Sequence, residues 1–266
     1  MAKIEGNKCM KIMGILNVTP DSFSDGGRYI DVDKAVEHAN KMVQDGASII
    51  DVGGESTRPG AIPVSKEEEL ARVIPVITRL VSVVGVDISI DTYKADVARE
   101  AVRAGATMIN DVRSGRDDNM LQVMAEANVP VVLMHNLPHG QEKESFHNIT
   151  EEVSVKLQKR VDLALAAGVK IEQIILDPGI GFGKTMEQNI ELIKNIQQFK
   201  KLGFPIMLAA SKKRTIRGLA KSDDPSSLEI GTVATTCYAF TKNIDYVRVH
   251  DVKENKIAIN VMKGLG

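Results

Sequence analysis

The sequence predicts an α/β protein with the fold of a (β/α)8 TIM barrel, formed by residues 1–266 as a single domain. Short segments rich in Ile and Val, apolar on both faces, alternate with segments whose apolar residues recur at helical spacing. Strands buried on both faces are typical of parallel sheets, and alternation of strand and helix indicates a parallel α/β fold. Eight such units in about 250 residues favour a closed barrel over an open sheet. No low-complexity linker divides the chain.

The expected strands share this buried character. In chain order they are KIMGILN (11–17), ASIIDVG (47–53), VDISIDT (86–92), ATMINDV (106–112), VPVVLMHN (129–136), QIILDPG (173–179), FPIMLAAS (204–211) and YVRVHDV (246–252). Amphipathic segments that predict helices lie between them, among them 33–44, 66–81, 94–104 and 154–167.

Short local signals mark where several of these helices begin and end. Ser65 followed by Glu68 predicts a capping box at the start of the helix over 66–81. Glycine is the preferred residue just after a helix C-terminus. Four glycines stand where a predicted helix turns into the next strand: Gly46, Gly105, Gly168 and Gly203.

The composition excludes several classes of protein. Lys and Arg number 34 and Asp and Glu 35, so the net charge of −1 gives no support for nucleic-acid binding. Cys9 and Cys237 stand far apart and form neither a disulfide framework nor a zinc knuckle. No apolar run approaches the ~18 residues of a membrane helix, and the N-terminus does not resemble a signal peptide. We therefore expect a cytoplasmic protein that binds neither nucleic acid nor membrane.

Polar side chains stand at the end of every predicted strand. Barrel active sites lie at the carboxyl ends of the strands, so these residues predict an active site at one common mouth. Taken singly, Asp51 and Asp111 are equally compatible with helix caps. The strand-end residues are Asn17, Asp51, Asp91, Asn110 with Asp111, His135 with Asn136, Asp177, Ser211 with Lys212 and Lys213, and Arg248 with His250.

Two apparent motifs at this end of the barrel do not withstand inspection. LDPGIGFGKT ends like a phosphate-binding P-loop, but Pro178 occupies the position of the required first glycine. We expect a tight turn that approaches a ligand, with Lys184 facing solvent. His135 and His139 are four residues apart, but Pro138 between them rules out the helix that a zinc pair would need.

Two groups of strand-end residues suggest binding chemistry. Arg248 and His250 lie two apart in a strand and so share a face, which predicts an anion pocket to which Lys212 and Lys213 add positive charge. Asp91, Asn110, Asp177 and Lys213 suit a flat, amide-like heterocycle. The structural alternative for the second group is a buried ion-pair layer. For the first group it is an arginine that reaches out to solvent and a histidine buried in the core. The loops over 15–27 and 53–61 are expected to cover the mouth.

Taken together, the motifs resemble one family. ILNVTPDSFSDGG, DVGGESTRPGA, ISIDTYK, IND, LDPGIGFGKT, ASKKR and VRVHDV occur in the order typical of bacterial dihydropteroate synthases and cover nearly the whole chain. This resemblance implies a homodimeric (β/α)8 enzyme of folate biosynthesis. Its members join 6-hydroxymethyl-7,8-dihydropterin diphosphate to p-aminobenzoate, releasing pyrophosphate and forming 7,8-dihydropteroate.

The resemblance also implies roles for particular residues. The expected pterin site comprises Asp91, Asn110, Met134, Asp177, Phe182 and Lys213. The expected diphosphate site comprises Asn17, Arg58, Arg248 and His250, with Mg²⁺ bound near Asn17. The expected p-aminobenzoate site comprises Phe23, Thr57, Pro59, Phe182 and Thr215. The expected catalytic residues are Asp91, Lys213, Arg248 and His250, with Asp91 opposing a pterin methylene cation after carbon–oxygen cleavage.

The sequence departs from the family pattern at two positions. Members commonly have arginine where Lys212 stands and serine where Arg214 stands. A point charge at Lys212 replaces a planar guanidinium, and sensitivity to sulfonamides does not follow from the sequence. Two alternatives stay open at this point: a pterin-binding paralogue without activity, and a methyltetrahydrofolate:corrinoid methyltransferase.

Overall fold

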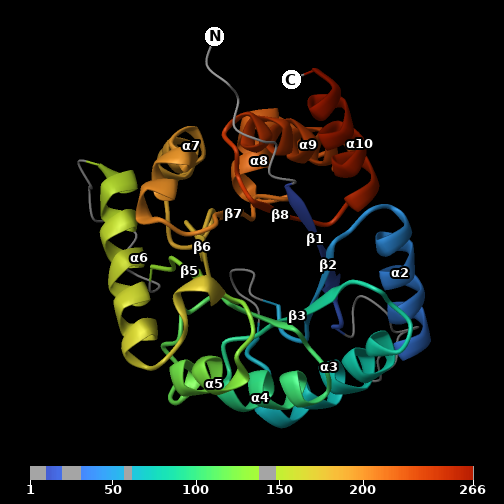
Figure 1. Ribbon diagram of the computed structural model, residues 1–266. Helices are drawn as coiled ribbons and strands as arrows, with labels where there is room; N and C mark the ends of the chain where they lie inside the picture. The colour runs from blue at the N-terminus through green and yellow to red at the C-terminus, as the bar shows by residue number, and fades with distance from the viewer. Residues whose placement is uncertain (1–9, 20–30, 57–61, 138–147, 266) are drawn as a thin grey trace.

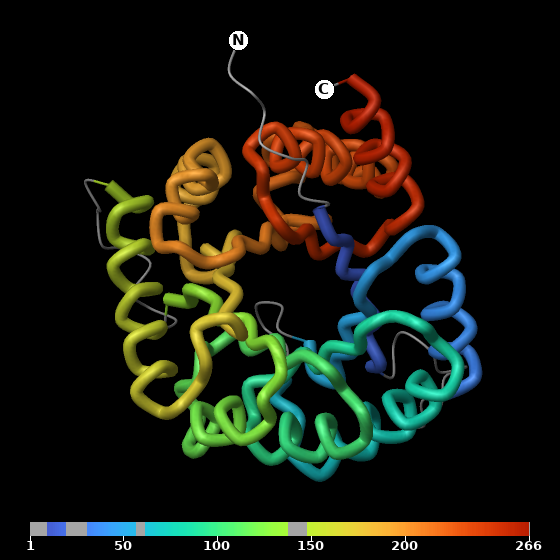
Figure 2. The backbone as a smooth tube through the Cα atoms, viewed as in Figure 1, coloured from blue at the N-terminus to red at the C-terminus, as the bar shows by residue number. Residues whose placement is uncertain are grey.

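Eight parallel strands form a nearly closed ring that is surrounded by helices (Figures 1 and 2). The computed structural model describes residues 10–19, 31–56, 62–137 and 148–265. The strand order is β6-β5-β4-β3-β2-β1-β8-β7, so the first strand pairs in parallel with both the second and the last. The expected (β/α)8 barrel is confirmed.

The strands are short and lie where the apolar runs predicted them. They are β1 (Lys11–Asn17), β2 (Ile49–Gly53), β3 (Asp87–Asp91), β4 (Met108–Asp111), β5 (Val131–Met134), β6 (Ile174–Asp177), β7 (Met207–Leu208) and β8 (Tyr246–Val249). The expected strand over 204–211 is reduced to two residues. The backbone N–H of Ile206 donates to the carboxylate of Asp245 (2.9 Å), and Pro205 has no N–H to donate.

The helices follow the strands in the sequence, α10 coming after the last strand, and they lie outside the ring in space (Figure 1). They are α2 (Val32–Gln44), α3 (Lys66–Val81), α4 (Ala95–Arg103), α5 (Met120–Ala127), α6 (Ile149–Ala166), α7 (Met186–Lys194), α8 (Arg214–Ala220), α9 (Pro225–Thr241) and α10 (Val252–Leu265). Two 3-10 helices, Ile171–Gln173 and Ile196–Leu202, precede β6 and β7.

The ring closes weakly between β6 and β7. A β-bridge joins Leu176 to Ile206, and the N–H of Leu176 donates to the carbonyl of Pro205 (2.9 Å). By contrast, β1 and β2 pair over five residue positions, from Met13–Ile49 to Asn17–Gly53. The β6–β7 junction is therefore the least paired joint among the described strands.

The local signals in the sequence mark the helix ends correctly. The Ser65 side chain accepts the N–H of Glu68 (3.1 Å), which is one half of the predicted capping box, while the Glu68 carboxylate pairs with Arg72. The helix α3 spans the predicted residues. Gly46, Gly105, Gly168 and Gly203 all adopt positive φ, between 86° and 111°. Glycine adopts this backbone conformation without the steric cost that a side chain imposes.

Side chains alternate between the inside of the barrel and the helices outside it, as strand geometry requires. One buried apolar layer fills the inside: Met13, Ile49, Met108, Val132, Ile175 and Met207, with Tyr246 packed against it. The intervening residues, such as Ile12 and Leu16 of β1, belong to a larger cluster shared with the helices. The next inward positions toward the carboxyl ends of the strands are mostly polar. The apolar layer is thus the floor of the mouth.

Truncating this floor should destabilise the protein. Ile49 is 1% exposed, and Ile49→Ala would leave a cavity that the surrounding strands cannot close. We expect the free energy of unfolding to fall by roughly 2–5 kcal/mol, measured by urea denaturation. Ile171→Ala, at a side chain that is 62% exposed, is the matched control. Equal effects of the two substitutions would contradict this description of the core.

Candidate active site

The predicted strand-end residues gather at the carboxyl end of the barrel. Asn17, Asp91, Asn110, Met134, Asp177 and Arg248 each occupy an inward position two or four residues beyond the apolar floor or its equivalent on their strand. A Cβ built on Gly53 would lie 3.6 Å from Asp91 Oδ2 and 3.9 Å from Asn17 Oδ1. Gly53 thus leaves room between the ends of β1 and β3.

Arg248 joins three strands across the mouth. Its Nε donates to Asp51 Oδ2 and its Nη2 to Asp91 Oδ2, both at 2.6 Å. Asp51 Oδ2 also accepts the side-chain amide of Asn110 at 3.0 Å. All four side chains are buried or nearly so. Charge-assisted hydrogen bonds of this kind fix geometry as well as charge.

The charges in this cluster do not fully compensate one another. Burial raises the pKa of Asp91 to about 7; Arg248 opposes that shift, while Asp51, Glu69 and Asp111 add to it. Burial would lower the pKa of Arg248, but Asp51 and Asp91 outweigh it and raise that pKa above its ordinary value. Arg248 is therefore a permanent cation facing two carboxylates.

Two carboxylate oxygens in the cluster are available as hydrogen-bond acceptors for a ligand. Among the described residues, neither Asp51 Oδ1 nor Asp91 Oδ1 has a hydrogen-bond partner, although both atoms are buried. Buried polar atoms are nearly always paired in native proteins, and an unpaired one calls for an explanation. A ligand with several N–H donors would supply the missing partners.

Asp177 at the end of β6 and Lys213 after β7 form a second group of opposite charges at the mouth. Asp177 is 2% exposed, and its Oδ1 accepts the N–H of Gly179 (2.7 Å). Lys213 donates to the carbonyl of Ile180 (2.7 Å), and its ammonium lies 4.6 Å from the centre of the Phe182 ring. Burial raises the pKa of Asp177, which Lys213 opposes, and burial lowers the pKa of Lys213 to about 8.

His250 is held by its neighbour Ser211. The Ser211 hydroxyl lies 2.9 Å from His250 Nδ1 and accepts the backbone N–H of His250 at 3.2 Å. Since Oγ already accepts one N–H, the hydroxyl is free to donate to Nδ1, which would leave Nε2 carrying the ring proton. The sequence indicated Ser211 only as a strand-end residue, and its contact with His250 gives it a role.

Comparison with known proteins agrees with this arrangement. A family model described as a pterin binding enzyme matches residues 13–250. Dihydropteroate synthase of Bacillus subtilis is 52% identical over 244 residues, which cover 91% of this chain and 84% of that protein. The chain belongs to the dihydropteroate synthase family.

Further relatives and solved structures agree. Dihydropteroate synthase of Clostridium beijerinckii is 51% identical over 93% of this chain and 91% of its own. A Xanthomonas albilineans dihydropteroate synthase structure with 4-aminobenzoic acid is 41% identical, with a TM-score of 0.91 over 96% of this chain and 93% of its own. A Clostridium difficile dihydropteroate synthase structure in the presence of pteroic acid is 46% identical, with the same TM-score over 98% of each chain.

Several expected residues of the dihydropteroate synthase site lie outside the described residues. These are Phe23, Thr57, Arg58 and Pro59, together with His139 of the rejected zinc pair. Thr215 lies in the first turn of α8, where its side chain is buried, and Arg214 beside it is exposed. His135 is buried too, and neither of its ring nitrogens has a hydrogen-bond partner in the described part of the chain.

Three interpretations of charged residues were wrong. Lys212 does not add charge to the anion pocket, because its ammonium lies 2.8 Å from Asp251 and 3.1 Å from Glu229. Its positive φ of 54° accompanies this different course of the backbone. Asp111 does not face the mouth: it follows the inward Asn110, and it accepts the N–H groups of Arg113 (2.7 Å) and Gly115 (2.5 Å).

Lys184 is the third. It was expected to face solvent, but its ammonium donates to three backbone carbonyls behind the loop after β6. Lysine side chains are long enough to reach back over their own loop, and the sequence pattern does not indicate which direction they take.

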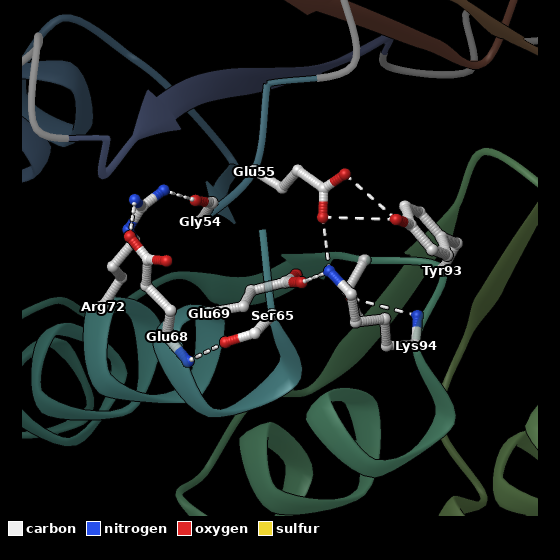
Figure 3. A network of polar contacts seen from close by, with 9 residues as sticks. Gly54, Glu55, Ser65, Glu68, Glu69, Arg72, Tyr93 and Lys94 are labelled. Atoms are coloured by element: carbon white, nitrogen blue, oxygen red, sulfur yellow. Dashed lines mark hydrogen bonds and ion pairs between the residues drawn. The ribbon is translucent and has the colours of Figure 1, made fainter. Parts of the chain in front are cut away.

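A second ionic network supports the end of β2 and was not foreseen (Figure 3). The Lys94 ammonium pairs with both Glu55 and Glu69, and the Tyr93 hydroxyl donates to Glu55 Oε1 at 3.0 Å. Burial alone would lower the pKa of Lys94, but the two glutamates outweigh it and raise that pKa. Glu55 directly precedes Ser56 and the segment 57–61, so the network fixes the point at which the chain leaves the barrel.

Arg72 of α3 holds the same stretch from the other side. Its Nη1 donates to the carbonyl of Gly54 (2.7 Å), and its Nη2 pairs with Glu68. A Cβ on Gly54 would lie 2.7 Å from Val73 Cγ1, so only glycine lets α3 pack this closely on the strand end. The spacing of GGES and DTYK in the sequence gave no sign that the two motifs meet.

Removing the cation of this network should be costly. Lys94→Met leaves the carboxylates of Glu55 and Glu69 uncompensated, and Glu69 is only 1% exposed. Breaking a buried ion pair typically costs roughly 3–5 kcal/mol, and we expect a loss of that order in the free energy of unfolding.

The matched control is Lys66→Met, which removes an exposed ion pair with Asp96 (2.8 Å). Exposed pairs contribute little, so the urea denaturation midpoint should barely move. A Lys94→Met protein as stable as the Lys66→Met protein would refute the importance of the network.

Proposed function

We propose that this chain is a transferase that joins 6-hydroxymethyl-7,8-dihydropterin diphosphate to p-aminobenzoate. The products are 7,8-dihydropteroate and pyrophosphate, a step in folate biosynthesis. The observation that carries the proposal is the pair of buried, unpartnered carboxylate oxygens on Asp51 and Asp91 beside Asn110, among the residues that the structure describes. Related enzymes support it: Xanthomonas albilineans dihydropteroate synthase has structures with 4-aminobenzoic acid and with 7,8-dihydropteroate.

The pterin would lie among Asp91, Asn110, Met134, Asp177, Phe182 and Lys213. A pterin presents amino and ring N–H donors along one edge, and these match carboxylate acceptors. Its ring carbonyl is an acceptor for a lysine ammonium. Met134 is buried at the end of β5 and Phe182 is half-buried, which gives apolar contact to a flat ring.

The diphosphate would bind Asn17, Arg58, Arg248 and His250. Arg248 uses Nε and Nη2 on Asp51 and Asp91, and a guanidinium has five N–H donors in all. Arg248 can therefore hold the carboxylates and still donate to an anion. This differs from the sequence-based picture of an arginine given wholly to the diphosphate.

A magnesium ion fits this donor set. Asn17 ends β1 with a side-chain oxygen, and Mg²⁺ prefers one or two protein oxygens together with substrate phosphates and water. No group of three or more His, Cys, Asp or Glu side chains suited to a metal occurs within the described residues. Asn17 would hold the ion, which when bound neutralises charge on the diphosphate.

The residues of the chain then have defined tasks. Carbon–oxygen cleavage leaves a cation on the pterin methylene group, and Asp91 provides the opposing negative charge. Arg248 holds Asp91 in place, and its permanent positive charge favours the ionised form of that carboxyl against the burial that raises its pKa. Lys213 and Asp177 hold the ring in register. The aniline nitrogen of p-aminobenzoate attacks the cation and then releases one proton to solvent, so no strong base is needed.

The p-aminobenzoate site would comprise Phe23, Thr57, Pro59, Phe182 and Thr215. Of these, Phe182 and Thr215 lie on either side of the β6–β7 junction. A dihydropteroate synthase of Yersinia pestis has a structure with a sulfonamide drug.

The homodimer and the cytoplasmic location stay predictions. Within the described residues, every helix is too short or too polar to cross a membrane.

The two alternative functions are less well supported. A corrinoid methyltransferase needs no diphosphate pocket, and relatives at 44–52% identity are named dihydropteroate synthases. All four expected catalytic residues, Asp91, Lys213, Arg248 and His250, are present in the chain, which favours an active enzyme over an inactive paralogue. Mixing the protein with the pterin diphosphate, p-aminobenzoate and Mg²⁺ and measuring pyrophosphate decides between them. Pyrophosphate formation supports the proposal, and its absence with intact pterin binding would favour the paralogue.

Asp91 should be required for turnover. Asp91→Asn keeps the shape but removes the charge that opposes the cation, so kcat should fall by roughly 10²–10³. The control is Asp87→Asn at the other end of the same strand, where the residue is exposed. Normal turnover of the Asp91→Asn enzyme would refute the assigned role.

Phe23 should matter for the second substrate only. We expect Phe23→Ala to raise KM for p-aminobenzoate several-fold while the affinity for the pterin diphosphate stays unchanged. Steady-state kinetics with each substrate varied in turn measures this difference. A parallel rise in both KM values would argue against contact between Phe23 and the incoming ring.

A further inference from the structure

We infer that Lys184 is a positioning residue for the pterin site, acting through the backbone of the loop after β6. The inference rests on the proposed function and deepens it. Lys184 is assigned no substrate contact, and it lies one residue beyond the third glycine of the GIGFG turn.

The ammonium of Lys184 contacts carbonyls of the segments that follow two neighbouring strands, β5 and β6. Nζ lies 2.7 Å from the carbonyl oxygen of Gly179, 3.1 Å from that of Phe182 and 3.3 Å from that of His135. An ammonium has three N–H donors, so each carbonyl is matched by one donor. The contact to His135 ties the loop after β6 to the end of β5.

The glycines explain why these carbonyls converge. Gly179, Gly181 and Gly183 all have positive φ, between 63° and 84°. A Cβ on Gly179 would lie 1.8 Å from the carbonyl oxygen of His135, so the turn lies directly on the backbone at the end of β5. Carbonyl oxygens brought together away from water need a donor, and Lys184 supplies it.

The same turn carries Phe182 and is hydrogen-bonded to Asp177 and Lys213, the other charged groups proposed to contact the pterin. Asp177 accepts the N–H of Gly179, and Lys213 donates to the carbonyl of Ile180, both at 2.7 Å. Two ammonium groups thus divide the carbonyls of one short turn: Lys184 takes Gly179 and Phe182, and Lys213 takes Ile180. The direction of Phe182 and the position of Asp177 both depend on this division.

The charge of Lys184 also acts on its surroundings. Burial lowers the pKa of Lys184 to about 7; Asp177 opposes the shift, and Lys213 and Lys156 add to it. His135, whose carbonyl Lys184 holds, has its own pKa lowered to about 2, chiefly by burial, so its ring stays neutral. As pH rises through 7 the ammonium loses a proton, and the neutral amine can donate to two carbonyls only.

Pteroic acid binding tests the inference. Lys184→Met keeps the length of the side chain but removes charge and donors. Small displacements of binding groups can cost up to about 10²-fold, so we expect pteroic acid to bind at least tenfold more weakly at pH 6, measured by calorimetry. The difference in pteroic acid affinity between the Lys184→Met protein and the unmodified protein should be smaller at pH 9, because the unmodified protein has itself lost the ammonium charge there.

The matched control is Lys194→Met at the exposed end of α7, which should bind as the unmodified protein does at both pH values. A Lys184→Met protein that is less stable but binds pteroic acid normally would overturn the inference, because a purely structural role predicts that result.

If Lys184→Met does not fold, Lys184→Gln decides, since its amide retains two N–H donors without charge. Normal affinity of the Gln variant at pH 6 would overturn the inference, and weakened affinity supports it. Pyrophosphate release by the unmodified protein tests the reaction separately. An unmodified protein that binds pteroic acid but releases no pyrophosphate would refute the reaction and leave the role of Lys184 in place.

Discussion

The guanidinium of Arg248 lies between the carboxylates of Asp51 and Asp91, and the organisation of the mouth depends on this contact. The partners are 197 and 157 residues away in sequence, on β2 and β3, and the pairing of β1 with both β2 and β8 brings these strands together. Without the arginine, two buried carboxylates would face each other uncompensated. The pairing of the first strand with the last and the charge balance at the mouth therefore depend on each other.

The compensation of buried polar groups at the mouth is incomplete, which reduces the stability of the protein. Asp51 and Asp91 each keep one buried oxygen without a partner in the described residues, and Glu69 nearby does the same. Such atoms cost free energy in the unliganded protein, and native proteins tolerate this cost mainly at functional sites. The apolar floor of the barrel and the ionic network around Lys94 offset it and hold the strand ends in place.

The strands and most of the mouth could be predicted from the sequence because they follow from short-range pattern. Inward and outward positions alternate along a strand, so the pattern alone assigned Asp91, Asn110, Asp177 and Arg248 to one face. Asp51 was placed at the mouth but its pairing with Arg248 was missed, because no pattern links residues so far apart. The predictions for Lys184 and Lys212 were wrong for another reason. A long flexible side chain after a glycine turn or at positive φ can point in either direction.

The weak joint between β6 and β7 bears on how the protein responds to its substrates. Asp177 and Phe182 belong to one side of this joint, and Lys213 and Thr215 belong to the other. A ligand that contacts residues on both sides would bridge the least paired part of the ring of described strands. The free energy of binding then adds to the resistance of the barrel against opening, in proportion to ligand occupancy. Under the proposed function, substrate binding and closure of the barrel are therefore coupled at the β6–β7 joint.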